Sequence, residues 1–143
     1  MLHMIVEQTR EYPMRMEYDP QTGTFHETEY RALAAVRGFT MPYGWIKESG
    51  TPPGPHWDCI LLSDEGFSLG DEVEVRIIGV FERIDGDQKY IAVEVSRSIC
   101  DLSQITDTER DALHLLYPQV RDGEGWHGAE RAQWCMDHCA RAL

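Results

Sequence analysis

Two long segments rich in Val and Ile, separated by a short turn, constrain the fold more than any other feature of this sequence. The segments are Asp71–Arg83 and Gln88–Val95, and Ile84-Asp85-Gly86-Asp87 lies between them. β-Branched residues favour extended strands, and an Asp-Gly pair between two such strands is a strong hairpin signal. The sequence therefore predicts a long antiparallel hairpin in the second half of the chain.

Shorter strands are predicted upstream of this hairpin. Alternating polar and apolar residues follow Pro13, and turn residues 19–23 then lead into another extended segment, which is the pattern of a second hairpin. An apolar run after residue 56 is typical of a buried strand. Residues 30–39 are ambiguous and support no prediction. The predicted upstream strands are Leu2–Glu7, Met14–Tyr18, Thr24–Glu27, Pro42–Ile46 and Trp57–Leu62.

The segment Glu48–Pro55 is predicted to be a loop. Its last six residues contain three prolines and two glycines. Proline lacks the N–H that helices and central strands use, so this composition excludes both.

The last third of the chain changes to helical patterns. Thr106-Asp107-Thr108-Glu109 forms a capping box that opens a helix ended by Pro118. Residues Ala129–Ala142 have an apolar stripe at helical spacing and predict a C-terminal helix. Many short strands followed by two helices predict an α+β fold, a small closed barrel with helices packed outside. We find no repeat or linker, so residues 1–143 are expected to form one domain.

The charge balance excludes some partners. The chain has 13 basic and 25 acidic residues, a formal net charge of -12. Binding to nucleic acid or to an anionic membrane needs an excess of Lys and Arg, so neither is expected. An acidic protein can still bind an anionic substrate when divalent cations invert the local field.

The cysteines and the N-terminus indicate a cytoplasmic protein. Cys59, Cys100, Cys135 and Cys139 include no CxxC pair and lack zinc-site spacing, so we interpret them as free thiols in a reducing compartment. No signal peptide and no apolar stretch of about 18 residues is present.

Several segments, in order, resemble the family I inorganic pyrophosphatases. Tyr43-Gly44-Trp45-Ile46, a loop ending in Asp58, and Cys59–Leu62 are similar to the family's Tyr-Gly-Tyr-Ile strand and its Asp-x-Asp-Pro-x-Asp segment. Arg76–Val80, followed by Asp85–Lys89, resembles the family's Arg-Pro-x-Gly-Val strand, acidic hairpin and Asp-x-Lys step. Residues 124–130 resemble its Gly-Trp entry into the terminal helix. Together these matches span roughly residues 5 to 140.

The resemblance implies a five-stranded OB-like β-barrel with flanking helices and a C-terminal helix. It also implies magnesium-dependent hydrolysis of pyrophosphate, or of a related phosphoanhydride, to phosphate. The expected partner is a small-molecule phosphate substrate, and the chain is expected to form a homo-oligomer.

Site roles carry over position by position. The metal ligands would be Asp58, Asp85 and Asp87, supported by Glu7 and Glu17. The water would be activated by Asp58 or Asp85. Phosphate would be bound by Arg15, Tyr43, Lys89 and Tyr117.

Departures from the family pattern weaken this metal site. Pro53 and Pro55 stand where the family has two aspartates, one of which usually activates the water, and Pro118 replaces a lysine. His56 stands at a proline position and could replace a lost ligand, which would favour Mn²⁺ or Zn²⁺ over Mg²⁺. Two hypotheses follow: a weakened or redirected phosphohydrolase, or a catalytically silent phosphate-binding, metal-binding or assembly module with the same fold.

Overall fold

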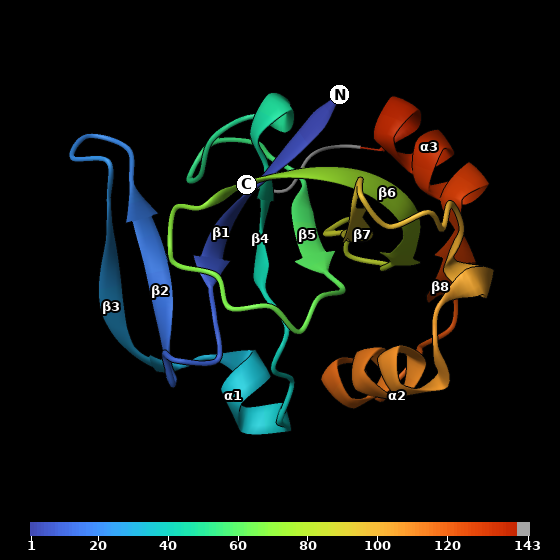
Figure 1. Cartoon of the computed structure of the whole chain (residues 1–143), viewed down its shortest axis with the longest axis horizontal. Coiled ribbons are helices and arrows are strands. Elements are labelled where there is room, and N and C mark those ends of the chain that lie inside the picture. The colour runs from blue at the N-terminus through green and yellow to red at the C-terminus, as the bar shows by residue number, and fades with distance from the viewer. Residues whose placement is uncertain (140–143) are drawn as a thin grey trace.

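The protein is built around a closed β-barrel, as Figure 1 shows for a computed structural model that describes residues 1–139. Hydrogen bonds link six strands in this order: β1 (Leu2–Gln8), β4 (Tyr43–Ile46), β5 (Asp58–Leu61), β7 (Lys89–Glu94), β6 (Glu72–Glu82) and β8 (Gly125–Gly128). An additional pairing of β1 with β6 closes the ring. This confirms the α+β barrel predicted from the sequence. The strands of the closed ring are β1, β4, β5, β6 and β7.

The predicted central hairpin is β6 and β7. The two strands are antiparallel, with Val75 opposite Glu94 and Phe81 opposite Lys89. The register shifts between Ile77 and Gly79, which marks a β-bulge. A Cβ on Gly79 would lie 2.7 Å from the carbonyl oxygen of His127, so only glycine lets the next strand approach this closely.

Strand β5 is the predicted buried strand, and all of its residues are buried. It pairs antiparallel with β4 on one side and parallel with β7 on the other. The parallel pairing sets Asp58 opposite Lys89. No local signal in the sequence indicates this neighbour, because the two segments are separated by β6 along the chain.

A second, two-stranded sheet projects from the barrel at the left of Figure 1. It contains β2 (Met14–Asp19) and β3 (Thr24–Arg31), which confirms the predicted hairpin but with a longer second strand. The segment without a prediction forms the end of β3 and a short helix, α1 (Leu33–Arg37). The predicted loop begins with a 3₁₀ turn, Lys47–Ser49, and is otherwise irregular.

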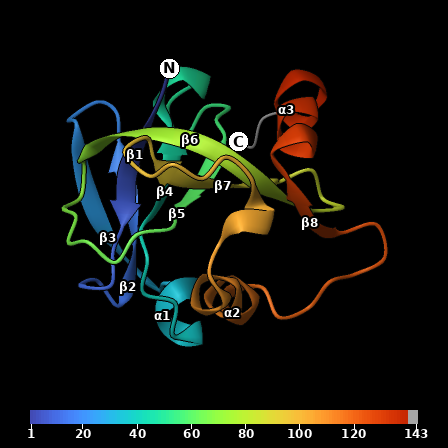
Figure 2. The same cartoon turned by 45° about the vertical axis from the view of Figure 1, so that its right-hand side comes forward.

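The helices cover two ends of the barrel. Helix α2 (Asp107–Leu116) opens with the predicted capping box of Thr106 and Glu109. It lies beside α1, and Figure 2 shows the two together below the barrel. Helix α3 (Ala129–His138) packs on β6.

Three details of the C-terminal third differ from the prediction. Helix α3 ends at His138 because Cys139 adopts an extended backbone; residues 140–142, predicted to be helical, lie outside the described range. The strand β8 (Gly125–Gly128) was not predicted, since its two glycines give no strand signal. A 3₁₀ turn, Leu102–Gln104, also precedes α2.

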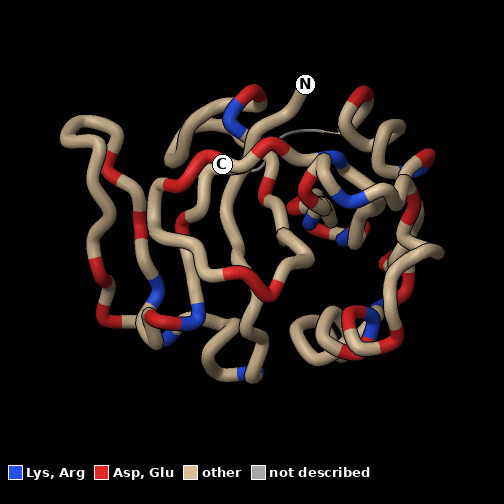
Figure 3. Tube along the Cα trace, in the orientation of Figure 1, with Lys and Arg blue, Asp and Glu red and all other residues tan. Residues whose placement is uncertain are grey.

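The excess negative charge is spread over the molecule. Figure 3 shows acidic positions on the β2–β3 hairpin, along the connecting loops and around the helices, rather than in one patch. No helix within residues 1–139 is long and apolar enough to span a membrane.

Candidate active site

The pairing of β5 with β7 places a lysine among three oxygen groups. The Nζ atom of Lys89 donates to Asp58 Oδ2 at 2.7 Å, to Asp87 Oδ2 at 2.9 Å and to the Tyr43 hydroxyl at 3.0 Å. The Lys89 side chain is only 7% exposed. These residues come from β4, β5, the start of β7 and the turn before it, so the barrel brings together groups that lie far apart in the sequence.

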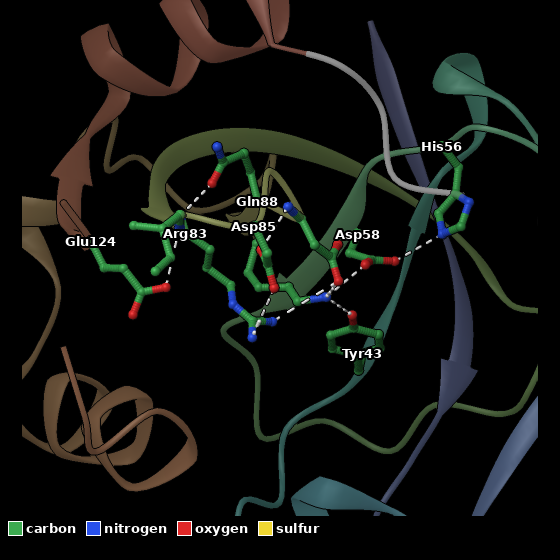
Figure 4. Close-up of polar contacts among 10 residues, drawn as sticks. Tyr43, His56, Asp58, Arg83, Asp85, Gln88 and Glu124 are labelled. Carbon is green, nitrogen blue, oxygen red and sulfur yellow. Dashed lines mark hydrogen bonds and ion pairs between the residues drawn. The ribbon is translucent and has the colours of Figure 1, made fainter. Parts of the chain in front are cut away.

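A histidine occupies the other side of Asp58, as Figure 4 shows. His56 Nε2 lies 2.9 Å from Asp58 Oδ1, and Nδ1 lies 2.8 Å from the carbonyl oxygen of Gly54. Both partners are acceptors, so both ring nitrogens carry a proton when both bonds form. Accordingly the pKa of His56 is raised: burial acts to lower it, but the hydrogen bonds to Asp58 and Gly54 outweigh burial. A histidine held in this way has no lone pair for a metal, which argues against the ligand role considered from the sequence.

The two aspartates titrate very differently. Burial acts to raise the pKa of Asp58, yet hydrogen bonds from His56 and Lys89 hold it well below its usual range. The pKa of Asp87 is raised, first by burial and then by the neighbouring Asp58 carboxylate. Burial alone would lower the pKa of Lys89, but Asp58 raises it. At neutral pH Asp58 and Lys89 therefore form a buried ion pair.

Arg83 also points into this cluster, from the opposite direction to His56 (Figure 4). Its guanidinium lies 3.3 Å from Asp85 Oδ2, 3.9 Å from Asp87 Oδ2 and 5.7 Å from the centre of the Tyr117 ring. The sequence interpretation did not include Arg83. The sequence did contain a signal for Arg83: it directly precedes the predicted turn with Asp85 and Asp87. Residues that flank a tight hairpin turn lie next to each other in space.

These side chains line a cavity of about 460 Å³. Of the residues predicted for the site, all but one line it: Glu7, Arg15, Glu17, Tyr43, Asp58, Asp87, Lys89 and Tyr117. The exception is Asp85, whose Oδ1 accepts a hydrogen bond from the backbone N–H of Asp87 at 2.9 Å. Asp85 thus shapes the turn and holds Arg83, which is the local role that an Asp-Gly turn suggests.

The predicted residues differ in their exposure. Arg15 and Glu17 lie on β2 with mostly exposed side chains, 4.0 Å apart, at the edge of the cavity. Glu7 is half-buried on β1, and burial followed by the nearby Asp58 raises its pKa to about 7. Tyr117 is buried and stacks on Phe81, with ring centres 5.0 Å apart. The cavity therefore has a buried ionic floor and a rim of exposed charged side chains.

Comparison with known proteins agrees with the resemblance seen in the sequence. Residues 4–142 match the family model of inorganic pyrophosphatase. The chain belongs to the inorganic pyrophosphatase family. An inorganic pyrophosphatase from Mycoplasma genitalium is 30% identical over 120 residues, covering 81% of this chain and 64% of that protein, slightly under two thirds. One from Helicobacter pylori is 25% identical over 136 residues, covering 93% of this chain and 78% of its relative.

Solved structures of pyrophosphatases share the fold. A crystal structure of an inorganic pyrophosphatase from Neisseria gonorrhoeae superposes with a TM-score of 0.73 at 19% identity, covering 94% of this chain and 86% of that one. The enzyme from Thermus thermophilus gives 0.63 at 22% identity, with 91% and 83% covered. This pyrophosphatase-family chain therefore keeps the family's barrel over nearly its full length.

The carboxylates of this family member are held by its own cations. Asp58 is bound by His56 and Lys89, and Asp87 by Lys89. Within residues 1–139 no group of three or more His, Cys, Asp or Glu side chains is arranged to hold a metal ion. Asp58 and Asp87 are therefore two carboxylates that share Lys89 as a hydrogen-bond donor.

Proposed function

We propose that this protein hydrolyses inorganic pyrophosphate, or a related phosphoanhydride, to phosphate in the cavity beside β5 and β7, with weaker or redirected activity relative to its family. The observation that carries the proposal is the convergence of Asp58, Asp87, Lys89 and Tyr43 on one cavity in a chain of this family. Buried cations and hydroxyl donors stabilise the charge that develops on phosphate oxygens during transfer.

Magnesium fits this site when it is bound to the substrate phosphates. Mg²⁺ is usually held by one or two carboxylates together with substrate phosphates, and it keeps several waters. Asp58 and Asp87 supply such a pair, so we propose that Mg²⁺ enters with pyrophosphate. The ion would neutralise substrate charge and polarise a phosphoryl oxygen. Mn²⁺ could take the same carboxylates, whereas the proton-bearing His56 gives Zn²⁺ no added ligand.

The protein's own residues would bind and orient the phosphates. Lys89 lies on the floor of the cavity, and the guanidinium of Arg83 lies beside it and could turn from Asp85 to a phosphate oxygen. Arg15 would reach from the rim. Guanidinium groups suit this task because they bind two oxygens at once.

Of the two residues proposed to activate water, geometry favours Asp58. Asp58 lines the cavity, whereas Asp85 lies outside it. The lowered pKa of Asp58 makes it a weak base, which is one physical reason to expect slow turnover. Glu7 and Glu17 remain proposed as supporting groups for the metal.

The test is phosphate release from pyrophosphate with Mg²⁺, Mn²⁺ and Zn²⁺ supplied separately, beside calorimetric titration of metal and substrate. Asp58→Asn keeps the shape of the side chain and should lower kcat by roughly 100-fold. Asp85→Asn should lower it much less, because Asp85 does not line the cavity. Equal activity of Asp58→Asn and the unmodified protein would contradict the site. Anion binding without turnover in the unmodified protein would instead support the silent-module alternative.

Location and assembly complete the proposal. We expect a cytoplasmic homo-oligomer that acts on a small-molecule phosphate and binds neither nucleic acid nor membrane. Sedimentation velocity measures the assembly, and a monomer at micromolar concentration would contradict it.

A further inference from the structure

The cavity is lined by two chemically different sets of residues. The residues around Lys89 form the charged side, described above. The second set comes from β2, the segment 32–39 around α1, the end of α2 and the proline-rich loop. We call it the apolar side; its members are Met16, Ala32, Leu33, Ala34, Phe39, Pro52, Pro53 and Leu116.

The size of the cavity exceeds what a small inorganic ion requires. Its volume of about 460 Å³ falls within the range of roughly 300–1,000 Å³ typical of pockets for organic ligands. Pyrophosphate is a compact ion without carbon, and its oxygens would be satisfied by the charged side alone. The apolar side would then face water.

Leu33 shows why an uncovered apolar side is unfavourable. It is the first residue of α1, lines the cavity and leaves 45% of its surface exposed. Ala32, Phe39 and Leu116 line the same cavity and are nearly fully buried. Covering such a surface with hydrocarbon removes apolar area from water and is therefore favourable.

We propose that the cavity takes a diphosphate that carries a hydrocarbon substituent, with the phosphates at Lys89 and Arg83 and the substituent against Leu33. This rests on the proposed function and names the substrate class of the same site. A nucleoside substituent fits less well, because the side chains of the apolar side offer its polar groups no hydrogen-bond partner.

The chemistry is that of the proposed hydrolysis. The oxygen of water bonds to the terminal phosphorus, and the bridging P–O bond breaks with its electron pair passing to the organic phosphate. One water is consumed, and the products are inorganic phosphate, the organic monophosphate and a proton released to solvent.

The experiment separates substrate class from activity by measuring binding and turnover independently. Calorimetry with Mg²⁺ present would use three methylene-bridged probes that resist hydrolysis: the analogues of pyrophosphate, of dimethylallyl diphosphate and of ADP. Phosphate release would be measured with the three natural compounds. The test variant is Leu33→Ser, and the control is Val36→Ser on the same helix, because Val36 is 61% exposed and does not line the cavity.

We expect the dimethylallyl probe to bind roughly tenfold more tightly than the pyrophosphate probe. Leu33→Ser should weaken the dimethylallyl probe by about fivefold and leave the pyrophosphate probe within twofold. Val36→Ser should change neither.

Two results would overturn the inference. One is equal binding of the dimethylallyl and pyrophosphate probes, with no difference between the two variants. The other is tighter binding of the ADP probe than of the dimethylallyl probe. In either case pyrophosphate turnover can persist, so the proposed hydrolysis would be kept and the organic substituent abandoned. Leu33-dependent binding of the dimethylallyl probe without any phosphate release would support the site and contradict the activity.

Discussion

At the residue scale, the candidate site depends on which groups keep a proton. Asp58 is held ionised by His56 and Lys89, while Glu7 on β1 lines the same cavity with a pKa raised to about 7. Two carboxyl groups with such different environments could perform different roles at neutral pH. The raised value also carries a cost in stability, because at higher pH folding must keep the Glu7 charge in a half-buried place beside another anion.

Replacing Glu7 should therefore stabilise the protein at high pH. The folded-state pKa is above the ordinary value of 4.5, so the contribution of Glu7 to stability is complete below about pH 4.5 and is lost as pH rises to about 7. Glutamine does not ionise, so Glu7→Gln should raise the free energy of unfolding by about 1–3 kcal/mol at pH 8. At pH 4 the two proteins should agree. Urea unfolding at both pH values measures this, and an equal difference at both would contradict the burial of Glu7.

At the element scale, the sequence predicted an element correctly where the signal lay within a few neighbouring residues. The Asp-Gly turn between β6 and β7 and the Thr106–Glu109 capping box both appear as predicted. Each depends on residues within one turn, and such interactions form in the same way in any fold. By contrast, α1 has no side-chain N-cap and β8 has no β-branched residues, so packing against the rest of the molecule decides them.

The capping box of α2 provides a test at this scale. Glu109 caps Thr106 and also binds Arg97 through both carboxylate oxygens. The hydrogen bond from Arg97 holds the pKa of Glu109 below its usual range, so its stabilising effect is present at neutral pH and is lost as pH falls through that lowered pKa. Glu109→Gln keeps the cap but not the charge, and should cost about 1 kcal/mol at pH 7 and less at pH 3.

The matched control for this variant is Asp107→Asn in the same first turn. The side chain of Asp107 is 97% exposed and pairs with Arg110 at 3.2 Å. Its replacement should change the free energy of unfolding by less than about 0.5 kcal/mol. Thermal unfolding followed across pH 3 to 7 measures both, and a pH-independent loss in Glu109→Gln would show that the ion pair with Arg97 contributes nothing.

At the scale of the whole molecule, the site joins a rigid barrel to a less protected hairpin. Strands β5 and β7 are almost entirely buried, whereas β2 and β3 form a separate two-stranded sheet whose residues are mostly exposed. The cavity uses both, with Asp58 and Lys89 on the barrel and Arg15 on the hairpin. We expect the barrel to fix the ionic floor and the hairpin to adjust to a ligand.

Amide hydrogen exchange tests this division. The amides of β5 and β7 should exchange only through global unfolding, and those of β2 and β3 at least about 100-fold faster. Adding Mg²⁺ and the bridged pyrophosphate probe should slow exchange in the hairpin. Uniform protection of both regions, with no effect of the probe on the hairpin, would contradict it.

The sequence by itself determined the strands and helices with strong local signals and the α+β class. Through ordered motifs it also indicated the family and most of the charged residues that line the cavity. These features follow from nearest neighbours along the chain: turn chemistry, capping and alternation. Only the tertiary structure decided that β5 lies parallel to β7, so that Lys89 neutralises Asp58, that Arg83 enters the site and that Asp85 stays outside it. Those outcomes depend on which buried strands become neighbours, and burial of apolar area is non-directional, so the sequence pattern alone does not specify the partner.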